Sequence, residues 1–540
     1  MKRRDFLKAI PLGAAVAGIP FAFGNTRASA LFDFPMQKML QPLQNTNDNI
    51  LVMIYLEGGN DGLNTVVPFE DPLYDSFRPT IGFTTPDEKN SLIFRPRPDL
   101  GMNPQLNALQ PLWQENKLAI LQNVGNSNPD LSHFRSSDIW NSASDPTINV
   151  PTGWAARYLE NLYPNYPQIA PEDPLAISIG YYQSAAFFGS NGLVNIRIDD
   201  PRTYLSNAVQ KNNAVPSTEG GVELAFMRNL ISLSNVYAAR FNNLFPKYAV
   251  NSVTYPDNQL ARDLQKVAWC IASGLKTKVY YVHLKGFDTH IGQFSKDPTV
   301  GGHAQLLKYL GDAMFAFQRD LEGLKVDQRV LTMTYSEFGR RVSGLGGESS
   351  GTDHGTAAPQ FLLGSNVAGN VYGKTPDLKN LDNNGNLIYE FEFRQMYASI
   401  LQDWLGVDAD TTATLLNPEA TPSKFETKFP VNASGVTQSL FHAPLGRVTS
   451  STPQNESILD ISPNPCRDET TVRFQLLQSE NIILTLHDTG GRLIRELYNA
   501  KLGAGTQEIK VFTHDLASGS YYFRLQIGGE VKTGKITCIR

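Results

Sequence analysis

Carboxylate and imidazole side chains follow apolar stretches of this chain at several separate places. The six residues are Asp61, Asp288, His290, Glu337, Asp353 and His354. Mixed carboxylate and imidazole donors suit divalent cations such as zinc, manganese, magnesium or calcium. We therefore predict that these residues bind a divalent metal, whose type the residues do not specify.

Three of these residues also have an ordinary structural interpretation. Asp61 stands in an Asn-Asp-Gly turn pattern, and Asp288 precedes a helical pattern that it could cap. Glu337 could form an ion pair with Arg340 or Arg341. Their shared position after apolar stretches favours a common site, because ligands bind outside the carboxyl ends of strands in open α/β sheets.

A possible nucleophile and its neighbours occur in "LSHFR", residues 131–135. Ser132 is the candidate nucleophile, with the alternative that it is only a hydroxyl donor beside His133. Arg135, Arg340 and Arg341 are candidates to bind a tetrahedral oxyanion, because guanidinium matches that geometry. The alternative is that at least one of these arginines is a solvated surface charge.

The other histidines and the cysteines carry weaker indications. His303 lies near a helix start and could still join the site, whereas His283 lies inside an apolar stretch and is interpreted either as core or as a residue that supports the site ligands from behind. Three cysteines are too few for a disulfide scaffold. Cys270 is interpreted as core, and Cys466 and Cys538 could form a disulfide or remain thiols.

The middle of the chain alternates continuous apolar stretches with helical patterns. The predicted strands are 49–59, 117–125, 174–180, 278–286, 329–339 and 360–364. The predicted helices are 221–245, 257–275, 302–324 and 392–406. Continuous apolar strands are typical of sheets that are buried on both faces. We therefore predict an α/β domain over 48–445, with a mostly parallel sheet covered by helices on both faces.

The two ends of the chain differ from this middle part. Residues 1–30 combine an Arg-Arg pair, a short apolar run and the small residues Ala-Ser-Ala, which predicts a twin-arginine-type signal peptide rather than an uncleaved anchor. After a linker at 446–456, residues 457–540 alternate short strands with turns, which predicts a small all-β antiparallel sandwich.

Composition narrows the class of partner. The net charge of −5 gives no sign of the excess of basic residues that binds nucleic acid, so we expect no nucleic-acid partner. No stretch after the signal peptide is long and apolar enough to predict a transmembrane segment.

The end of the chain also resembles a known family. "ISPNPCRDETTVRF", "LHDTGGRLIREL" and "LASGSYYFRLQIGG" are similar to the C-terminal sorting domain of type IX secretion substrates. The resemblance implies the type IX secretion machinery as a partner, with passage through the periplasm to the cell surface or the outside. It also implies removal or anchoring of the tail. The alternative is an ordinary carbohydrate-binding or adhesive sandwich.

The middle of the chain resembles another family. "YLEGGNDGLNTVVP", "SHF", "GFDTH", "SEFGRRV", "GTDHG" and "VYG" are similar to the recurring phrases of the exported domain-of-unknown-function-1501 family, over about residues 48–410. The fold of that family resembles the alkaline phosphatase and sulfatase superfamily. The resemblance therefore implies a dinuclear metal site at the carboxyl edge of a parallel sheet.

Residue by residue, the resemblance implies specific roles for positions of this sequence. Asp61 would hold one metal ion, Asp288 and His290 the other, and Ser132 would be the nucleophile. Glu337, Gly339 and His354 would match an aspartate, a glycine and a late histidine ligand.

The sequence departs from the superfamily pattern near these positions. Phe338 stands where a histidine ligand is usual, and Asp288 and His290 are closer together than the usual pair. We therefore expect a one-metal site, or one in which His133 replaces the missing ligand.

Together these features predict an exported, metal-dependent hydrolase-like protein that acts on phosphate or sulfate esters, with surface polysaccharide as one candidate carrier. The alternative is a non-catalytic surface binding or assembly protein with a degenerate metal site. Small-molecule or polysaccharide esters are the expected substrates of the first alternative.

Overall fold

The computed structural model describes most of the predicted α/β domain and the tail. The described residues are 47–127, 129–167, 171–190, 192–203, 237–245, 250–295, 297–344, 350–417, 440–442, 460–476, 479–488, 493–503, 505–527 and 530–539. The chain divides into two compact units, Met1–Leu445 and Gly446–Arg540. The predicted signal peptide and linker lie outside the described residues, as does most of the predicted helix 221–245.

A nine-stranded sheet forms the centre of the first unit. Its order is β14 (Val371–Tyr372), β4 (Leu118–Gly125), β13 (Ala358–Leu363), β10 (Val330–Tyr335), β1 (Ile50–Glu57), β9 (Val279–Lys285), β5 (Ala176–Ile179) and β8 (Asn195–Ile198), with β15 (Phe391–Glu392) beside β4. All six predicted strands are present. Strand β13 is antiparallel to β10 and β4, and the other pairs in this sheet are parallel. The predicted mostly parallel α/β sheet is therefore confirmed.

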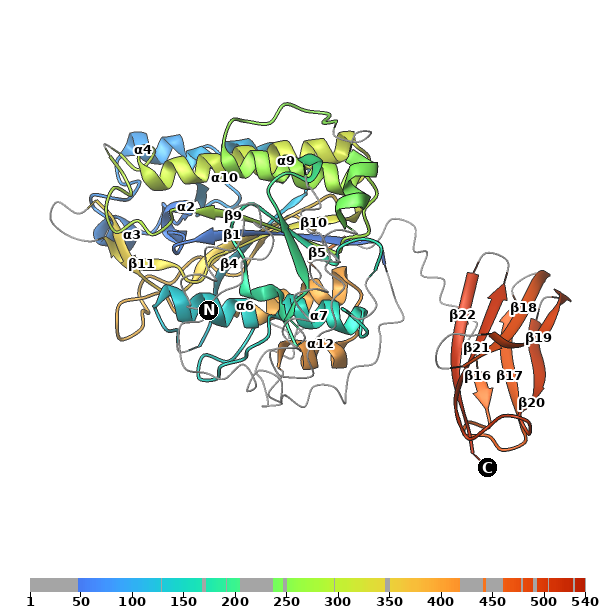
Figure 1. Cartoon of the computed structure of the whole chain (residues 1–540). Helices are drawn as coiled ribbons and strands as arrows, with labels where there is room; N and C mark the ends of the chain where they lie inside the picture. The colour runs from blue at the N-terminus through green and yellow to red at the C-terminus, as the bar shows by residue number, and fades with distance from the viewer. Residues whose placement is uncertain are drawn as a thin grey trace, which may run out of the picture. The chain divides into compact units, whose positions relative to one another are not determined.

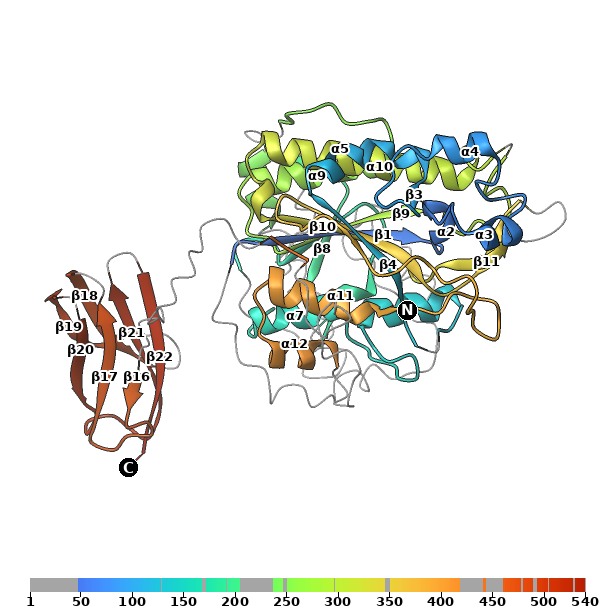
Figure 2. The same cartoon turned by 180° about the vertical axis from the view of Figure 1, so that it is seen from behind.

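Helices cover both faces of this sheet (Figures 1 and 2). One face carries α9 (Gln259–Ala272) and α10 (Gly302–Gly323), and the other carries α6 (His133–Ser142), α7 (Trp154–Leu162), α11 (Phe393–Ser399) and α12 (Ala409–Leu416). Shorter elements are α2 (Gly62–Thr65), α3 (Pro72–Phe77), α4 (Pro86–Ser91), α5 (Gln110–Gln114) and the strand pairs β2 (Val66–Val67) with β3 (Gly101–Met102) and β6 (Phe188–Gly189) with β7 (Gly192–Leu193).

Strand β1 shows why its sequence is an apolar run up to Leu56. Val52 and Ile54 belong to the core on the side of α9 and α10, whereas Leu51 and Met53 belong to the core on the opposite side. All four side chains are fully buried. Burial of both faces removes the polar alternation that a half-exposed strand would show.

The carboxyl ends of four strands meet at one edge of the sheet. Strands β9 and β10 are parallel to β1, and the antiparallel strand β13 restores the same direction in β4. A separate hairpin, β11 (Arg340–Gly344) with β12 (Thr352–His354), pairs Arg340 with His354. This pairing returns the chain to the edge at which β10 ends.

The second unit consists of two antiparallel sheets. One contains β16 (Asp460–Ser462), β17 (Glu469–Leu476) and β20 (Gly505–Phe512), and the other contains β19 (Leu493–Leu502), β18 (Glu480–His487), β21 (Gly519–Ile527) and β22 (Glu530–Cys538). Val472 from the first sheet and Leu484 and Phe523 from the second share one buried core. The predicted small antiparallel all-β unit is therefore confirmed.

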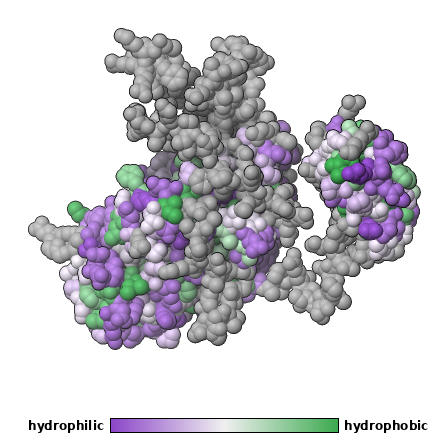
Figure 3. All heavy atoms as spheres, turned by 90° about the horizontal axis from the view of Figure 1, so that it is seen from below, coloured by the Kyte–Doolittle hydropathy of each residue, from purple (hydrophilic) through white to green (hydrophobic). Residues whose placement is uncertain are grey.

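The described surface is mostly hydrophilic on the face shown in Figure 3, where hydrophobic residues are scattered in small groups. Among the helices that the structure describes, none has the length and apolar character needed to cross a membrane.

Gly58 provides a test of how tightly the edge of the sheet is packed. It has φ +119°, and a Cβ atom there would lie 2.2 Å from the backbone nitrogen of Asp288. We expect Gly58→Ala to lower the free energy of unfolding by about 3 kcal/mol, because it adds a backbone clash to the strain of a positive φ. The control Gly274→Ala has φ +87° but no atom within 4 Å, and should cost only about 1 kcal/mol. Equal losses of unfolding free energy in the two variants, measured by chemical denaturation, would contradict tight packing at Gly58.

Candidate metal centre

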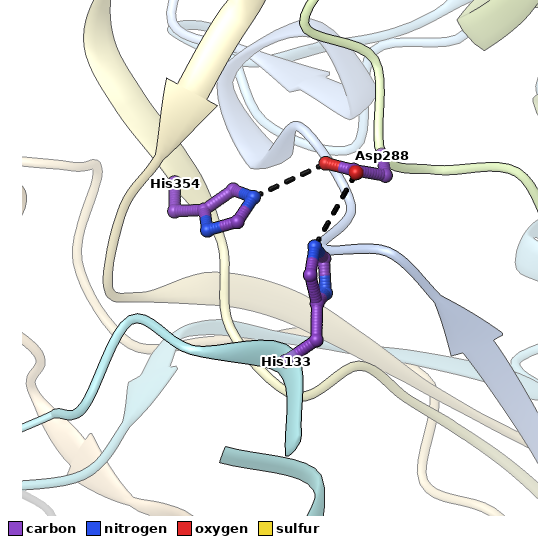
Figure 4. A group of neighbouring side chains, drawn as sticks. All are labelled: His133, Asp288 and His354. Atoms are coloured by element: carbon purple, nitrogen blue, oxygen red, sulfur yellow. Dashed lines mark hydrogen bonds and ion pairs between the residues drawn. The ribbon is translucent and has the colours of Figure 1, made fainter. Parts of the chain in front are cut away.

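Three side chains from distant parts of the chain converge at this edge. His133 begins α6, Asp288 follows β9, and His354 ends β12. Their ligand atoms all lie within 4.8 Å of one another. Nε2 of His133 lies 3.4 Å from Oδ2 of Asp288, and Nε2 of His354 lies 3.1 Å from Oδ1 of Asp288. Figure 4 shows both imidazoles directed at the carboxylate between them.

The orientation of His133 is set from behind by Glu337. Nδ1 of His133 lies 2.8 Å from Oε1 of Glu337, which also accepts a hydrogen bond from the backbone nitrogen of Gly58 at 2.9 Å. A carboxylate only accepts, so Nδ1 carries the proton and Nε2 presents its lone pair to Asp288. This Nε2 atom is buried and has no hydrogen-bond partner among the described residues. An imidazole held by a carboxylate in this way is a common arrangement behind a bound metal.

His354 is oriented in the same manner by a backbone carbonyl. Its Nδ1 lies 2.7 Å from the carbonyl oxygen of Leu131, which can only accept a hydrogen bond. In its neutral form with the proton on Nδ1, His354 turns an Nε2 lone pair toward Asp288, whereas its protonated form donates from Nε2 to the carboxylate at 3.1 Å. Two lone-pair donors now face one carboxylate, so a proton or a cation must lie between them to offset their repulsion.

The donor set and its spacing fit a metal ion. An ion about 2.1 Å from each of two tetrahedral ligands holds those ligand atoms about 3.4 Å apart. The separations of 3.4 Å from His133 to Oδ2 of Asp288 and 3.1 Å from His354 to Oδ1 are close to this value, although one ligand atom from each residue lies only within 4.8 Å of the others. Two imidazole nitrogens and one carboxylate oxygen form a set used for zinc and other transition metals.

Asp288 is ionised at neutral pH. Burial by itself would raise the pKa of Asp288, but hydrogen bonds from Arg340 and His354 outweigh burial and lower the pKa to about 2. For His133, the hydrogen bond to Glu337 is the largest influence, and it raises the pKa above its usual value. Metal binding at this centre must therefore displace a proton more firmly held than that of a free histidine.

His290 and Asp353 lie beside the cluster rather than within the group of three. Nε2 of His290 is 2.9 Å from Nε2 of His354 and 3.1 Å from Oδ1 of Asp288. Nδ1 of His290 is 3.5 Å from Oδ1 of Asp353, whose side chain is 41% exposed. Burial and the Arg340 charge lower the pKa of His290, so a neutral imidazole adjoins the cluster.

Asp61, a predicted metal ligand, forms a buried ion pair. Its Oδ2 accepts from Arg78 at 2.6 Å within a fully buried ion pair, and Gln293 donates to the same oxygen. Burial alone would raise the pKa of Asp61, but the Arg78 charge outweighs it and the pKa is lowered. Asp61 is not in the group of three, but its Oδ1 is buried without a hydrogen-bond partner among the described residues, so its role as a metal ligand stays a prediction. Glu337 is likewise placed behind His133 rather than in the group of three.

The predicted oxyanion-binding arginines are mostly engaged elsewhere. The Arg340 side chain is fully buried and donates to the carbonyl oxygens of Gly59 and Thr352 at 2.9 Å, and to Asp288 at 2.6 Å. This corrects the prediction that Arg340 contacts substrate: it positions the loops around the cluster instead. Arg135 pairs with Asp138 at 2.6 Å and also caps backbone carbonyls.

Arg341 and Ser132 are the remaining predicted groups. The Arg341 side chain is 43% exposed, with Nε 3.8 Å from Asp353. Ser132 is exposed at the N-cap of α6, directly before His133, and its hydroxyl makes no capping hydrogen bond. Its role as a nucleophile stays a prediction.

Phe338 forms an apolar wall of the cluster. Its ring centroid lies 5.0 Å from that of His133 and 4.6 Å from that of His354. The Phe338 side chain cannot ligate a metal, but it restricts the two imidazoles on one side. The prediction that this position lacks a ligand agrees with the observed packing.

Three features of the site were not predicted. Glu57 and His283 form a pair 2.5 Å apart at the end of β1 and β9, and a pocket of about 670 Å³ lies between this pair and the cluster. Glu57 follows an apolar stretch just as the predicted ligands do. The same criterion, an acid at the end of an apolar strand, could therefore have identified it from the sequence. No pattern in the sequence connects Arg78 with Asp61.

His303, which the sequence left as a further candidate for the site, is buried in α10 and lies 3.0 Å from Asn60.

These observations define the first unit as an α/β protein with a candidate metal centre at the carboxyl edge of its sheet. Residues 271–419 match the family described as "Protein of unknown function (DUF1501)", and residues 460–539 match the "Secretion system C-terminal sorting domain". Both predicted resemblances are therefore confirmed over these ranges. The sorting domain implies type IX secretion to the cell surface or the outside.

Solved structures similar to the chain include members of the alkaline phosphatase superfamily. A superfamily protein from Vibrio parahaemolyticus is 13% identical, with 74% of this chain and 77% of that chain covered and a TM-score of 0.34. Alkaline phosphatase from the Antarctic bacterium TAB5 is 10% identical, with 59% and 92% covered and a TM-score of 0.21. Dimeric latent PorU from Porphyromonas gingivalis is 21% identical over 15% of this chain and 9% of that chain, with a TM-score of 0.13. No curated protein matches the chain.

The hydrogen bond between Glu337 and His133 provides a test of the metal centre. We expect Glu337→Gln to weaken zinc binding by about 10- to 100-fold, because a neutral amide orients and polarises the imidazole less strongly. The measurement is the zinc dissociation constant by competition with a chelator. Asp61→Asn is the matched control: it should lower the free energy of unfolding but leave the dissociation constant nearly unchanged. A larger loss of zinc affinity in Asp61→Asn than in Glu337→Gln would reverse the assigned roles.

Proposed function

We propose that this protein is an exported metal-dependent hydrolase of phosphate or sulfate esters. The observation that carries the proposal is the convergence of His133, Asp288 and His354, with both Nε2 lone pairs directed at the carboxylate. Such a preset donor group needs little reorganisation to bind an ion, which favours a functional over an accidental cluster.

The protein residues would hold one ion and surround the substrate. His133, Asp288 and His354 would be its ligands, and two imidazole donors favour zinc or manganese over calcium. A bound divalent ion would supply Lewis-acid polarisation of an ester oxygen. The exposed Ser132 hydroxyl, directly before His133, is the proposed nucleophile, and Arg341 is the cation left to approach an anionic substrate group.

His290 is the proposed proton-transfer group. It lies 3.1 Å from Asp288, and its lowered pKa keeps it neutral near pH 7, so it can accept a proton. Asp353, 3.5 Å away on its far side, would stabilise the imidazolium that forms. This division gives the predicted metal residues His290 and Asp353 a role beside the ion.

The second candidate function is non-catalytic surface binding or assembly with a reduced metal site. The observation that favours it is the pairing of Asp61 with Arg78, together with Phe338 in place of a ligand, because both remove donors from a second metal position. The two candidates differ in turnover, and a single bound ion is compatible with either.

Metal content and ester turnover of the purified full-length protein test the proposal. We expect about one zinc or manganese ion per chain, and hydrolysis of an aryl phosphate or an aryl sulfate. Asp288→Ala should lose the ion and reduce kcat/KM by at least about a hundredfold, because it removes the ligand shared by both histidines.

His442→Ala is the control, because His442 is exposed and contacts Asn116 outside the cluster. Both its metal content and its turnover should equal those of the unchanged protein. Bound metal without turnover of any ester would favour the non-catalytic function. Protein that takes up no metal, although folded, would exclude the hydrolase.

A further inference from the structure

The pocket beside the metal cluster is a separate binding region. Its volume is about 670 Å³, and His133 and Asp288 form part of its wall. The rest of the wall comes from the end of β1, from α6, from residues between 182 and 188, and from Gly286 and Glu337. A volume in this range holds a small organic ligand. An ester whose phosphoryl or sulfuryl group lies at the cluster would therefore place its leaving group in this pocket.

The charge of the pocket wall restricts what the leaving group can be. Apart from His133, the charged side chains among the described lining residues are all carboxylates: Glu57, Asp138, Asp288 and Glu337. Asp138 and Asp288 are paired with Arg135 and Arg340, so the repulsion of an anionic group depends on Glu57. Glu57 lies away from the cluster, is 41% exposed, and has a pKa lowered chiefly by its hydrogen bond with His283. A leaving group that carries its own carboxylate or sulfate would meet like charge there.

The aromatic part of the wall indicates what the pocket favours. Phe134 directly follows His133 in α6 and is 91% exposed, which is a large apolar surface to leave in water. Tyr182 is held in place by stacking on His283, with ring centroids 4.5 Å apart. Aromatic rings pack against the apolar C–H faces of sugar rings, while carboxylate oxygens accept hydrogen bonds from their hydroxyl groups.

We propose that this pocket binds a neutral, hydroxyl-bearing sugar ring and rejects a ring that carries an anionic group. Phe134 provides the stacking surface, and Glu57 accepts hydroxyl hydrogen bonds and repels anions. Assignment of the sugar as the leaving group rests on the proposed hydrolase function, whereas sugar binding itself requires no turnover.

Equilibrium binding of simple glycosides to the full-length protein tests this inference. The probes are a methyl hexopyranoside, the corresponding methyl hexuronide and the corresponding amino sugar glycoside. Measurements use metal-free protein, because the carboxylate of the hexuronide could otherwise ligate the ion. We expect the neutral glycoside to bind with a dissociation constant at least about tenfold lower than that of the hexuronide.

Two variants connect this preference with the pocket. Glu57→Gln keeps an acceptor but removes the charge, so it should reduce the preference for the neutral glycoside to less than about threefold. Phe134→Ala should weaken binding of the neutral glycoside by about three- to tenfold through loss of stacking. Phe512→Ala, which removes a 55%-exposed ring in β20 of the second unit, is the matched control and should change nothing.

Three results would overturn the proposal. They are equal or tighter binding of the hexuronide than of the neutral sugar, weaker binding of the amino sugar than of the hexuronide, and unchanged binding in Phe134→Ala. Failure of ester hydrolysis alone would not contradict the proposed sugar binding, because binding is measured without turnover. Conversely, hydrolysis without any sugar preference would remove only this inference.

An independent observation concerns the cysteines of the second unit. Sγ of Cys466 lies 3.4 Å from Sγ of Cys538, and both residues are buried. Their backbones are held together as well: the Cys466 nitrogen donates to the Thr537 carbonyl, and the Ile539 nitrogen donates to the Cys466 carbonyl, each at 2.9 Å. Exported proteins meet oxidising conditions in which paired thiols form disulfides.

The geometry points to a disulfide between Cys466 and Cys538 in the secreted protein. As the S–S bond forms, each thiol gives up one proton and one electron. A disulfide-bonded oxidant, such as an oxidoreductase or glutathione disulfide, takes up both electrons and both protons and leaves as two thiols. The cross-link would join the first part of the unit to its last strand, β22.

Thiol counting in the denatured full-length protein tests this cross-link. After incubation with glutathione disulfide during refolding, we expect one reactive thiol, from Cys270, and three after added reductant. Cys466→Ser should instead leave two reactive thiols, and Cys270→Ser should leave none. Three reactive thiols in the oxidised unchanged protein, or loss of thiols only through dimers, would overturn the inference.

Discussion

The buried guanidinium of Arg340 is the interaction on which the arrangement of the site depends. It donates to the carbonyl oxygens of Gly58 and Gly59 after β1, to Phe287 and Asp288 after β9, and to Thr352 in β12. Three segments that are far apart in sequence are thereby joined at one planar, charged group. A buried charge is stable only with such partners, so the loops and the arginine position one another.

The atoms proposed to bind the metal are held in position by hydrogen bonds from neighbouring groups. Glu337 holds Nδ1 of His133, the carbonyl of Leu131 holds Nδ1 of His354, and Arg340 holds Asp288. Each of these partners is a hydrogen-bonding group that the sheet or its loops fix in place. The cluster therefore does not depend on the ion to choose the tautomers of its histidines.

Much of the fold could be predicted from sequence because β1, β4, β9 and β10 are mostly continuous apolar runs without polar alternation, a pattern typical of strands that are buried on both faces. The rule that ligands follow strand ends selected Asp288, and the serine-histidine motif selected His133, and the structure brings both into the candidate cluster. The same rule selected Asp61, which pairs with Arg78 and is not in the group of three. The rule also did not identify Glu57, which lies in the wall of the pocket.

By itself, the sequence determined the order of strands and helices, the separate β-rich tail with its sorting motif, and the residue types available at the sheet edge. Those properties are local, since they depend on side-chain periodicity and turn composition over a few residues. Only the tertiary structure decided which acid joins the candidate metal cluster, which acids pair with arginine, and which face the pocket. These outcomes depend on contacts between residues hundreds of positions apart, such as Arg340 with Gly58, and no local pattern encodes them.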